Sequence, residues 1–139
     1  MMEFSIIYTT YRCGSYDIVA DSLANQTFKN FELIIVDDYK PDRSDIVKAY
    51  LESKGICARY IGPSKPKCFP ELAYNVSNAV NTGILLSAKE FIIIYQDYHW
   101  LAPDCLEKIA KREDLLRNNH CIVLPAQTYE SFAPRDNNG

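Results

Sequence analysis

Short apolar runs alternate with stretches of helical spacing along most of the chain, and this order constrains the fold more than any other feature. The runs are rich in β-branched and aromatic residues, which predicts buried strands at residues 4–9, 32–36, 58–61, 91–95 and 121–125. Apolar residues three and four positions apart predict amphipathic helices from Tyr16 onward and over residues 44–54, 72–88 and 103–117. Strands and helices in alternation predict an α/β fold with a mainly parallel sheet and helices on both faces.

Length and composition limit the classes of protein to consider. The 139 residues suit a single domain over residues 1–139, and 47% apolar with 24% charged residues is ordinary for a globular protein. A net charge of −3 argues against nucleic acid as the main partner, because phosphate backbones need a basic face. Five cysteines without a C-x-x-C pair fit a reducing cytosol, and the longest apolar run, residues 91–95, is too short to cross a bilayer. We therefore expect a cytoplasmic protein without a transmembrane segment.

Polar side chains follow three of the predicted strands at the point where each strand ends. These residues are Thr9, Thr10 and Tyr11 after the first strand, Asp37 and Asp38 after the second, and Gln96, Asp97, Tyr98 and His99 after the fourth. In an open parallel sheet, ligands bind beyond the carboxyl ends of the strands. Chance polarity of loops is the alternative, but a shared site explains better why all three ends carry hydroxyls or carboxylates.

The chemistry of this edge points to part of a nucleotide rather than to a phosphate cradle. The sequence contains neither G-x-G-x-x-G nor G-x-x-x-x-G-K-[ST]. Carboxylates repel phosphate, so they would face a ribose diol, a base N–H or a metal ion. A carboxylate that accepts the N3–H of uracil would discriminate against cytosine, and a divalent cation could bridge a carboxylate and a diphosphate.

Four segments, in this order, give the chain a family resemblance. They are FSIIYTTYR (residues 4–12), LANQTFKNFELIIVDD (23–38), AVNTGI (79–84) and EFIIIYQDYHWLAPDCLEKI (90–109). Together they resemble the family 2 glycosyltransferases of the GT-A fold. The resemblance implies the Rossmann-like, nucleotide-sugar-binding half of such an enzyme, with the acceptor-binding part missing or reduced. It also implies inverting transfer of a sugar from a nucleoside-diphosphate donor, UDP-sugar being favoured, to a sugar or other hydroxyl acceptor. The family's catalytic base lies in the later segment, so no base is assigned.

The resemblance also implies roles for individual residues. Thr9 and Tyr11 would border the nucleoside, and Asp38 would bind the uracil edge, with Asp37 the more structural of the pair. Asn81 would pack against the loop after the fourth strand or approach the ribose. Asp97 would contact the ribose and a metal ion. The basic candidates for the diphosphate are Arg12, Lys65 and Lys67.

The segment that resembles the family's D-x-D motif keeps a single carboxylate, Asp97. Counting back from Pro103 puts Gln96 at the first acidic position and Tyr98 at the usual metal ligand. A shift of one residue puts Asp97 first and His99 at the metal position. One carboxylate with diphosphate oxygens can hold Mg²⁺ or Mn²⁺ weakly, and His99 could help with Mn²⁺. Loss of metal-dependent transfer is the alternative.

Two other classes of protein fit the sequence less well. A noncatalytic nucleotide-sugar-binding or assembly module would explain the reduced D-x-D-like segment. An unrelated flavodoxin-like or receiver-like domain would use Asp37 and Asp38 as an acidic pocket. This class of protein does not explain the segment at residues 96–100.

Overall fold

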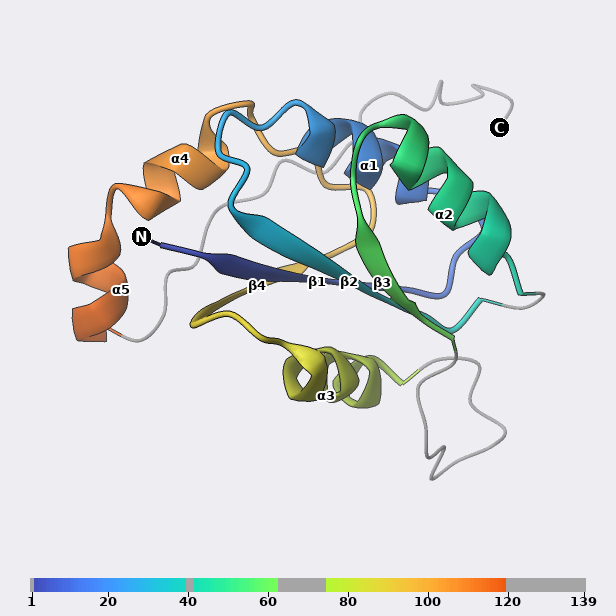
Figure 1. Ribbon diagram of the computed structural model, residues 1–139. Coiled ribbons are helices and arrows are strands. Elements are labelled where there is room, and N and C mark those ends of the chain that lie inside the picture. The colour runs from blue at the N-terminus through green and yellow to red at the C-terminus, as the bar shows by residue number, and fades with distance from the viewer. Residues whose placement is uncertain (1, 40–41, 63–74, 120–139) are drawn as a thin grey trace, which may run out of the picture.

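Parallel strands form a sheet of order β3-β2-β1-β4 (Figure 1). The computed structural model describes residues 2–39, 42–62 and 75–119, and within these ranges the strands are β1 (Phe4–Thr10), β2 (Phe31–Asp37), β3 (Ala58–Ile61) and β4 (Phe91–Tyr95). The register pairs Thr10 with Asp37, and Tyr8 with Tyr95. The α/β fold with a parallel sheet, predicted from the alternation of elements, is confirmed.

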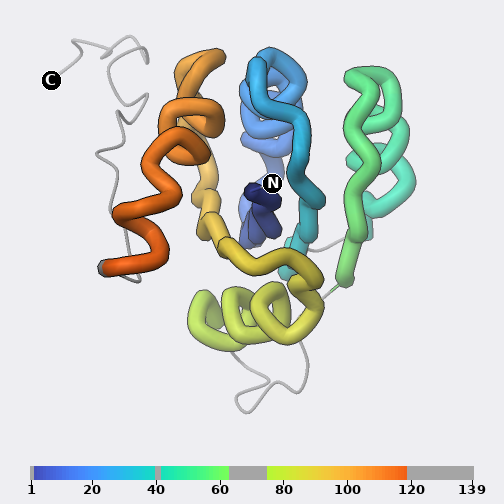
Figure 2. The backbone as a smooth tube through the Cα atoms, turned by 60° about the vertical axis from the view of Figure 1, so that its left-hand side comes forward, coloured from blue at the N-terminus to red at the C-terminus, as the bar shows by residue number. Residues whose placement is uncertain are grey.

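Helices cover both faces of the sheet, as Figure 2 shows. They are α1 (Tyr16–Ala24), α2 (Ser44–Ser53), α3 (Val76–Leu86), α4 (Cys105–Ala110) and α5 (Glu113–Asn119). Helix α3 lies on one face, and α1, α2 and α4 lie on the other. The larger core lies on the side of α1, where Leu23, Leu51 and Leu106 of three helices meet the strands. None of the helices in the described ranges is long and apolar enough to span a membrane.

The central strand β1 is buried along its whole length because both of its faces are covered. Phe4, Ile6 and Tyr8 belong to the larger core. Ile7 faces α3 at Gly83, where a Cβ atom would lie 2.2 Å from Cγ2 of Ile7. Glycine therefore lets α3 approach the sheet closely, which gives a packing reason for a residue that is otherwise poor in helices.

The ends of several elements differ from the sequence-based prediction. Helix α3 begins at Val76, because the side chain of Asn75 caps it by accepting the backbone N–H of Asn78 at 3.1 Å. The predicted helix over residues 103–117 is two helices, with a turn at residues 111–112. After this turn Leu116 still packs on the larger core, and Arg117 reaches Glu90 at 2.6 Å, just before β4. The predicted strand at 121–125 lies outside the described residues.

Candidate functional site

The tips of β1, β2 and β4 lie side by side at one edge of the sheet, as the sequence predicts. The backbone N–H of Asp38 donates to the carbonyl oxygen of Thr10 at 2.8 Å. On the other side of β1, the hydroxyl of Thr10 donates to Oδ2 of Asp97 at 3.1 Å. Thr10 therefore joins the ends of β2 and β4, although the sequence pointed to its neighbour Thr9.

The alternation of side chains along a strand explains this difference. Thr9 shares a face of β1 with Ile7, which packs on α3, whereas Thr10 shares a face with Tyr8. Tyr8 and Tyr95 lie in the same core, two residues before Thr10 and Asp97. Thr9 and Asp97 therefore lie at one edge but on opposite sides of the sheet, and no hydrogen bond between them is found in the described part of the chain.

The carboxylate of Asp97 is turned into the fold and accepts hydrogen bonds from three hydroxyls. Oδ1 accepts from the hydroxyls of Tyr8 at 2.6 Å and Ser15 at 2.5 Å, and Oδ2 accepts from Thr10. Burial, followed by the charge of Asp97, raises the pKa of Tyr8 well above its usual value, so Tyr8 stays a donor. Ser15 adopts a left-handed conformation, with φ of 75°, just before α1. We call Tyr8, Thr10 and Ser15 the hydroxyl cage of Asp97.

Asp37 serves the structure of this edge. Arg43 binds it through Nε at 2.7 Å and Nη2 at 3.2 Å, and the hydroxyl of Tyr60 donates to it at 2.9 Å. Arg43 also donates to the carbonyl oxygen of Cys13 at 2.6 Å. The pair is buried, with side-chain exposures of 6% and 1%. Asp37 and Arg43 thus fasten the loop after β2 to the loop after β1, which is the structural role expected of Asp37.

Asp38 and Thr9 are both buried beside the strand ends, with exposures of 3% and 4%. Both residues already have an interaction partner. Asn81 is exposed on α3, and its side chain makes no hydrogen bond within the described ranges.

Arg12 lies between two aromatic rings at the rim of this edge. Its Cζ atom is 5.6 Å from the ring centroid of Tyr11 and 5.4 Å from that of Tyr98. A hydrogen bond with Tyr11 raises the pKa of the Arg12 guanidinium. Tyr98 has a φ of 60°, a left-handed conformation that is uncommon for an aromatic residue. The sequence placed Tyr98 at this edge, at the position of the usual metal ligand, but did not indicate that its ring lies beside Arg12. Lys65 and Lys67, the other basic candidates for the diphosphate, lie outside the described residues.

Among the described residues, the donor atoms at this edge do not form a set that suits a divalent metal ion. Within residues 2–39, 42–62 and 75–119, no three histidine, cysteine, aspartate or glutamate side chains come together. The hydroxyl cage occupies both oxygens of Asp97. His99 lies with Nδ1 3.2 Å from the carbonyl oxygen of Gln96. Mg²⁺ needs near-octahedral oxygen ligands, and hydroxyl hydrogens that point at Asp97 oppose a cation there.

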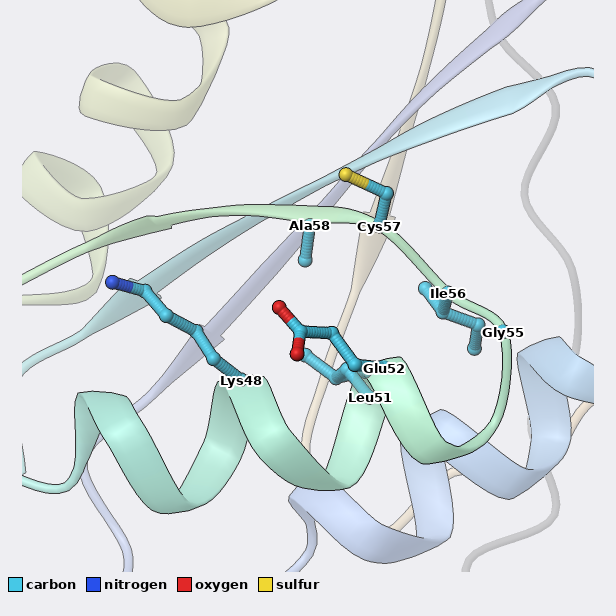
Figure 3. A pocket seen from close by; sticks show the side chains of 7 residues that line it. All are labelled: Lys48, Leu51, Glu52, Gly55, Ile56, Cys57 and Ala58. Carbon is cyan, nitrogen blue, oxygen red and sulfur yellow. The ribbon is translucent and has the colours of Figure 1, made fainter.

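A hollow of about 260 Å³ lies elsewhere, between α2 and the beginning of β3 (Figure 3). In Figure 3 the side chain of Glu52 points from α2 toward Ala58, whereas that of Lys48 extends from the same helix away from Ala58. Its lining includes the amino end of β3, so it lies away from the carboxyl ends where the polar side chains gather. It is therefore separate from the candidate site.

The comparison with known families decides the assignment. Residues 5–135 match the model described as Glycosyl transferase family 2. The chain belongs to this family. No curated protein matches it.

Solved structures of glycosyltransferases have the same fold as this family 2 member. S. aureus TarS is 23% identical with a TM-score of 0.63, over 86% of this chain and 20% of TarS. Its fragment 1–349, crystallised with UDP-GlcNAc, is 20% identical with a TM-score of 0.59, over 86% of this chain and 32% of the fragment. The mannosyltransferase PcManGT from Pyrobaculum calidifontis, in complex with GDP-Man and Mn²⁺, is 17% identical with a TM-score of 0.63, over 78% of this chain and 31% of PcManGT. The chain thus spans a third or less of these proteins, and the likeness shows the GT-A fold.

Proposed function

We propose that the chain binds a UDP-sugar at the carboxyl edge of β1, β2 and β4 and takes part in its transfer, with inversion, to a hydroxyl acceptor. The observation that carries this proposal is the family match over residues 5–135, together with the junction of the three strand tips at Thr10. The choice of UDP is supported by the TarS fragment, which has this fold and was crystallised with UDP and with UDP-GlcNAc.

In this proposal Thr9, Tyr11 and Asp38 border the nucleoside, and Asp38 accepts the N3–H of uracil. Asp38 is buried at the end of β2. A hydrogen bond to a carboxylate is stronger in such a place than in water, whereas a base edge that presents an acceptor repels the carboxylate. Cytosine presents an acceptor at N3, so a uracil nucleotide is the better ligand. Asn81 completes the set from α3, on the ribose side.

Metal-dependent transfer, which the family resemblance left open, is not part of this proposal. The PcManGT structure holds Mn²⁺, whereas the Asp97 and His99 donor set of this chain does not fit such an ion. Asp97 instead acts as a positioning residue, which holds the loop after β4 against the β1 tip through the hydroxyl cage. We place the proposed function in the cytoplasm, where nucleotide sugars would reach the site.

Titration calorimetry with UDP and CDP tests the proposed donor site. The unmodified chain should bind UDP more tightly than CDP, and Asp38→Ala should remove most of the UDP affinity without a change in the far-UV circular dichroism spectrum. Asp42→Ala is the matched control, because Asp42 is an exposed carboxylate in the loop that follows. Equal binding of UDP by the unmodified chain and Asp38→Ala would reject the role of Asp38 at the base edge.

A noncatalytic binding module is the second candidate, favoured by the single, engaged carboxylate of the D-x-D-like segment. Both candidates bind UDP, so binding does not separate them. The two candidates are separated by an assay of UDP release, which measures hydrolysis of, or transfer from, a panel of UDP-sugars. An enzyme releases UDP from at least one donor, while a binding module releases none.

A further inference from the structure

The described residues at this edge offer few anionic groups to hold a metal ion beside a donor diphosphate. Asp97 is the sole carboxylate of residues 96–100, and its two oxygens are used by hydroxyl donors. Gln96 and Tyr98, at the acidic positions counted back from Pro103, carry no charge. Residues 96–100 therefore offer no second anionic group with which to hold a divalent cation beside a diphosphate.

A fixed positive charge is present at the same edge. Arg12 lies two residues after the end of β1, and its backbone N–H donates to the hydroxyl of Thr10 at 3.3 Å. Thr10 in turn donates to Asp97, so Arg12 is tied to the point where β1 and β4 meet. Within the described part of the chain, the Arg12 guanidinium forms no ion pair. Its charge is thus left for a ligand.

The rings of Tyr11 and Tyr98 hold this guanidinium from two elements that are far apart in the sequence. The ring centroids lie 5.6 and 5.4 Å from Cζ of Arg12, within the range of a cation–π contact. Two ring contacts restrict a side chain that would otherwise lose considerable freedom on binding. A guanidinium also presents planar pairs of N–H donors that match phosphate oxygens, and it remains charged at all physiological pH values.

We propose that Arg12, held between Tyr11 and Tyr98, neutralises the donor diphosphate in place of a divalent cation, so that this chain binds UDP without metal. The inference rests on the proposed function, because it concerns the diphosphate of the same donor. It differs from the metal-bound arrangement implied by the family resemblance, in which the segment after β4 supplies anionic ligands.

Calorimetric titration of the full 139-residue chain with UDP and with uridine, in EDTA and in MnCl₂, tests the inference. In EDTA, UDP should bind roughly 10- to 100-fold more tightly than uridine, the range expected of charge-assisted hydrogen bonds. MnCl₂ should change the UDP affinity by less than about twofold. Arg12→Gln should reduce the UDP affinity to that of uridine and leave uridine binding unchanged, while Arg12→Lys should keep part of the difference because lysine retains the charge.

Arg112→Gln is the control for loss of one exposed arginine, since Arg112 lies between α4 and α5. It should bind UDP as the unmodified chain does. Uridine binding with a UDP advantage that appears only in MnCl₂ overturns the inference and leaves the proposed function in place. The inference is also overturned, and the proposed function stays in place, if Arg12→Gln in EDTA still binds UDP more tightly than uridine by the same factor as the unmodified chain. If neither UDP nor uridine binds under any condition, the proposed function fails and the inference fails with it.

Discussion

The phenolic oxygen of Tyr8 lies 2.6 Å from Oδ1 of Asp97 and ties the buried centre of the sheet to the segment after β4. Tyr8 is fully buried, and the centroid of its ring lies 6.4 Å from the ring centroid of Tyr95. The contact joins residues 89 positions apart in the sequence. It therefore anchors the loop after β4 to the core of the sheet.

Tyr8→Phe should lower the free energy of unfolding by about 1.5–3 kcal/mol, because it removes a charge-assisted hydrogen bond inside the fold and keeps the ring. Urea denaturation followed by circular dichroism measures this loss. The matched control is Tyr50→Phe, since Tyr50 donates to Asp21 at a longer 3.3 Å and is only half-buried. The control should lower the free energy of unfolding clearly less. Equal losses in the two variants would contradict a special role for the Tyr8–Asp97 contact.

Much of the architecture could be predicted because it depends on hydrophobic periodicity. The order of elements and the shared edge of β1, β2 and β4 follow from apolar runs that end in polar residues. The contacts of Asp97 could not be predicted, because they depend on Ser15 adopting a left-handed conformation without being glycine. The choice of Thr10 over Thr9 was accessible in principle, since Thr10 has the same strand parity as the aromatic Tyr8.

The partner of Asp37 shows a second limit of sequence reasoning. Several basic residues follow β2, and nothing in the pattern indicates that Arg43, six positions later, folds back onto Asp37. That contact depends on the path of the loop and on Tyr16 and Tyr39, whose rings lie 5.4 and 4.5 Å from the guanidinium. The break between α4 and α5 was likewise not predictable from the pattern, because Leu116 reaches the core only after the chain turns.

Arg43→Ala should be strongly destabilising, because it leaves the buried carboxylate of Asp37 without its counter-ion. Removal of one partner of a buried pair costs about 3–5 kcal/mol. Urea denaturation of Arg43→Ala and of Arg43→Ala combined with Asp37→Ala measures the coupling. The double variant should lose less than the sum of the single variants. Lys108→Ala, which removes an exposed ion pair with Asp104, should leave the free energy of unfolding nearly unchanged.

Gly83→Ala should lower the melting temperature although alanine favours helices. An added Cβ would lie 2.2 Å from Cγ2 of Ile7, and overpacking of this kind costs about 1–3 kcal/mol against a gain of about 1 kcal/mol in helix propensity. The net loss of up to about 2 kcal/mol corresponds to a decrease of up to roughly 8 °C. Gly62→Ala is the control, because nothing lies within 4 Å of a Cβ at that position. A melting temperature that rises in Gly83→Ala would show that α3 can move away from β1 at little cost.

Tyr98→Asp should change the cation that the donor site uses. Position 98 has a φ of 60°, which aspartate and asparagine tolerate better than tyrosine, so both substitutions should leave the loop folded. A carboxylate there would pair with Arg12 and supply an anionic ligand for a metal ion. We expect Tyr98→Asp to bind UDP more weakly than the unmodified chain in EDTA and to regain about tenfold in MnCl₂.

Tyr98→Asn isolates the carboxylate as the cause of this change. It removes the same ring from Arg12 and fits the same backbone conformation, but it adds no charge. Calorimetric titration with UDP should therefore show a weakened affinity in EDTA that MnCl₂ does not restore. A manganese response in Tyr98→Asn equal to that of Tyr98→Asp would mean that the ion is held by other groups. Absence of a response in Tyr98→Asp would count against the alignment that places Tyr98 at the family's metal position, because the restored carboxylate would then not face the diphosphate.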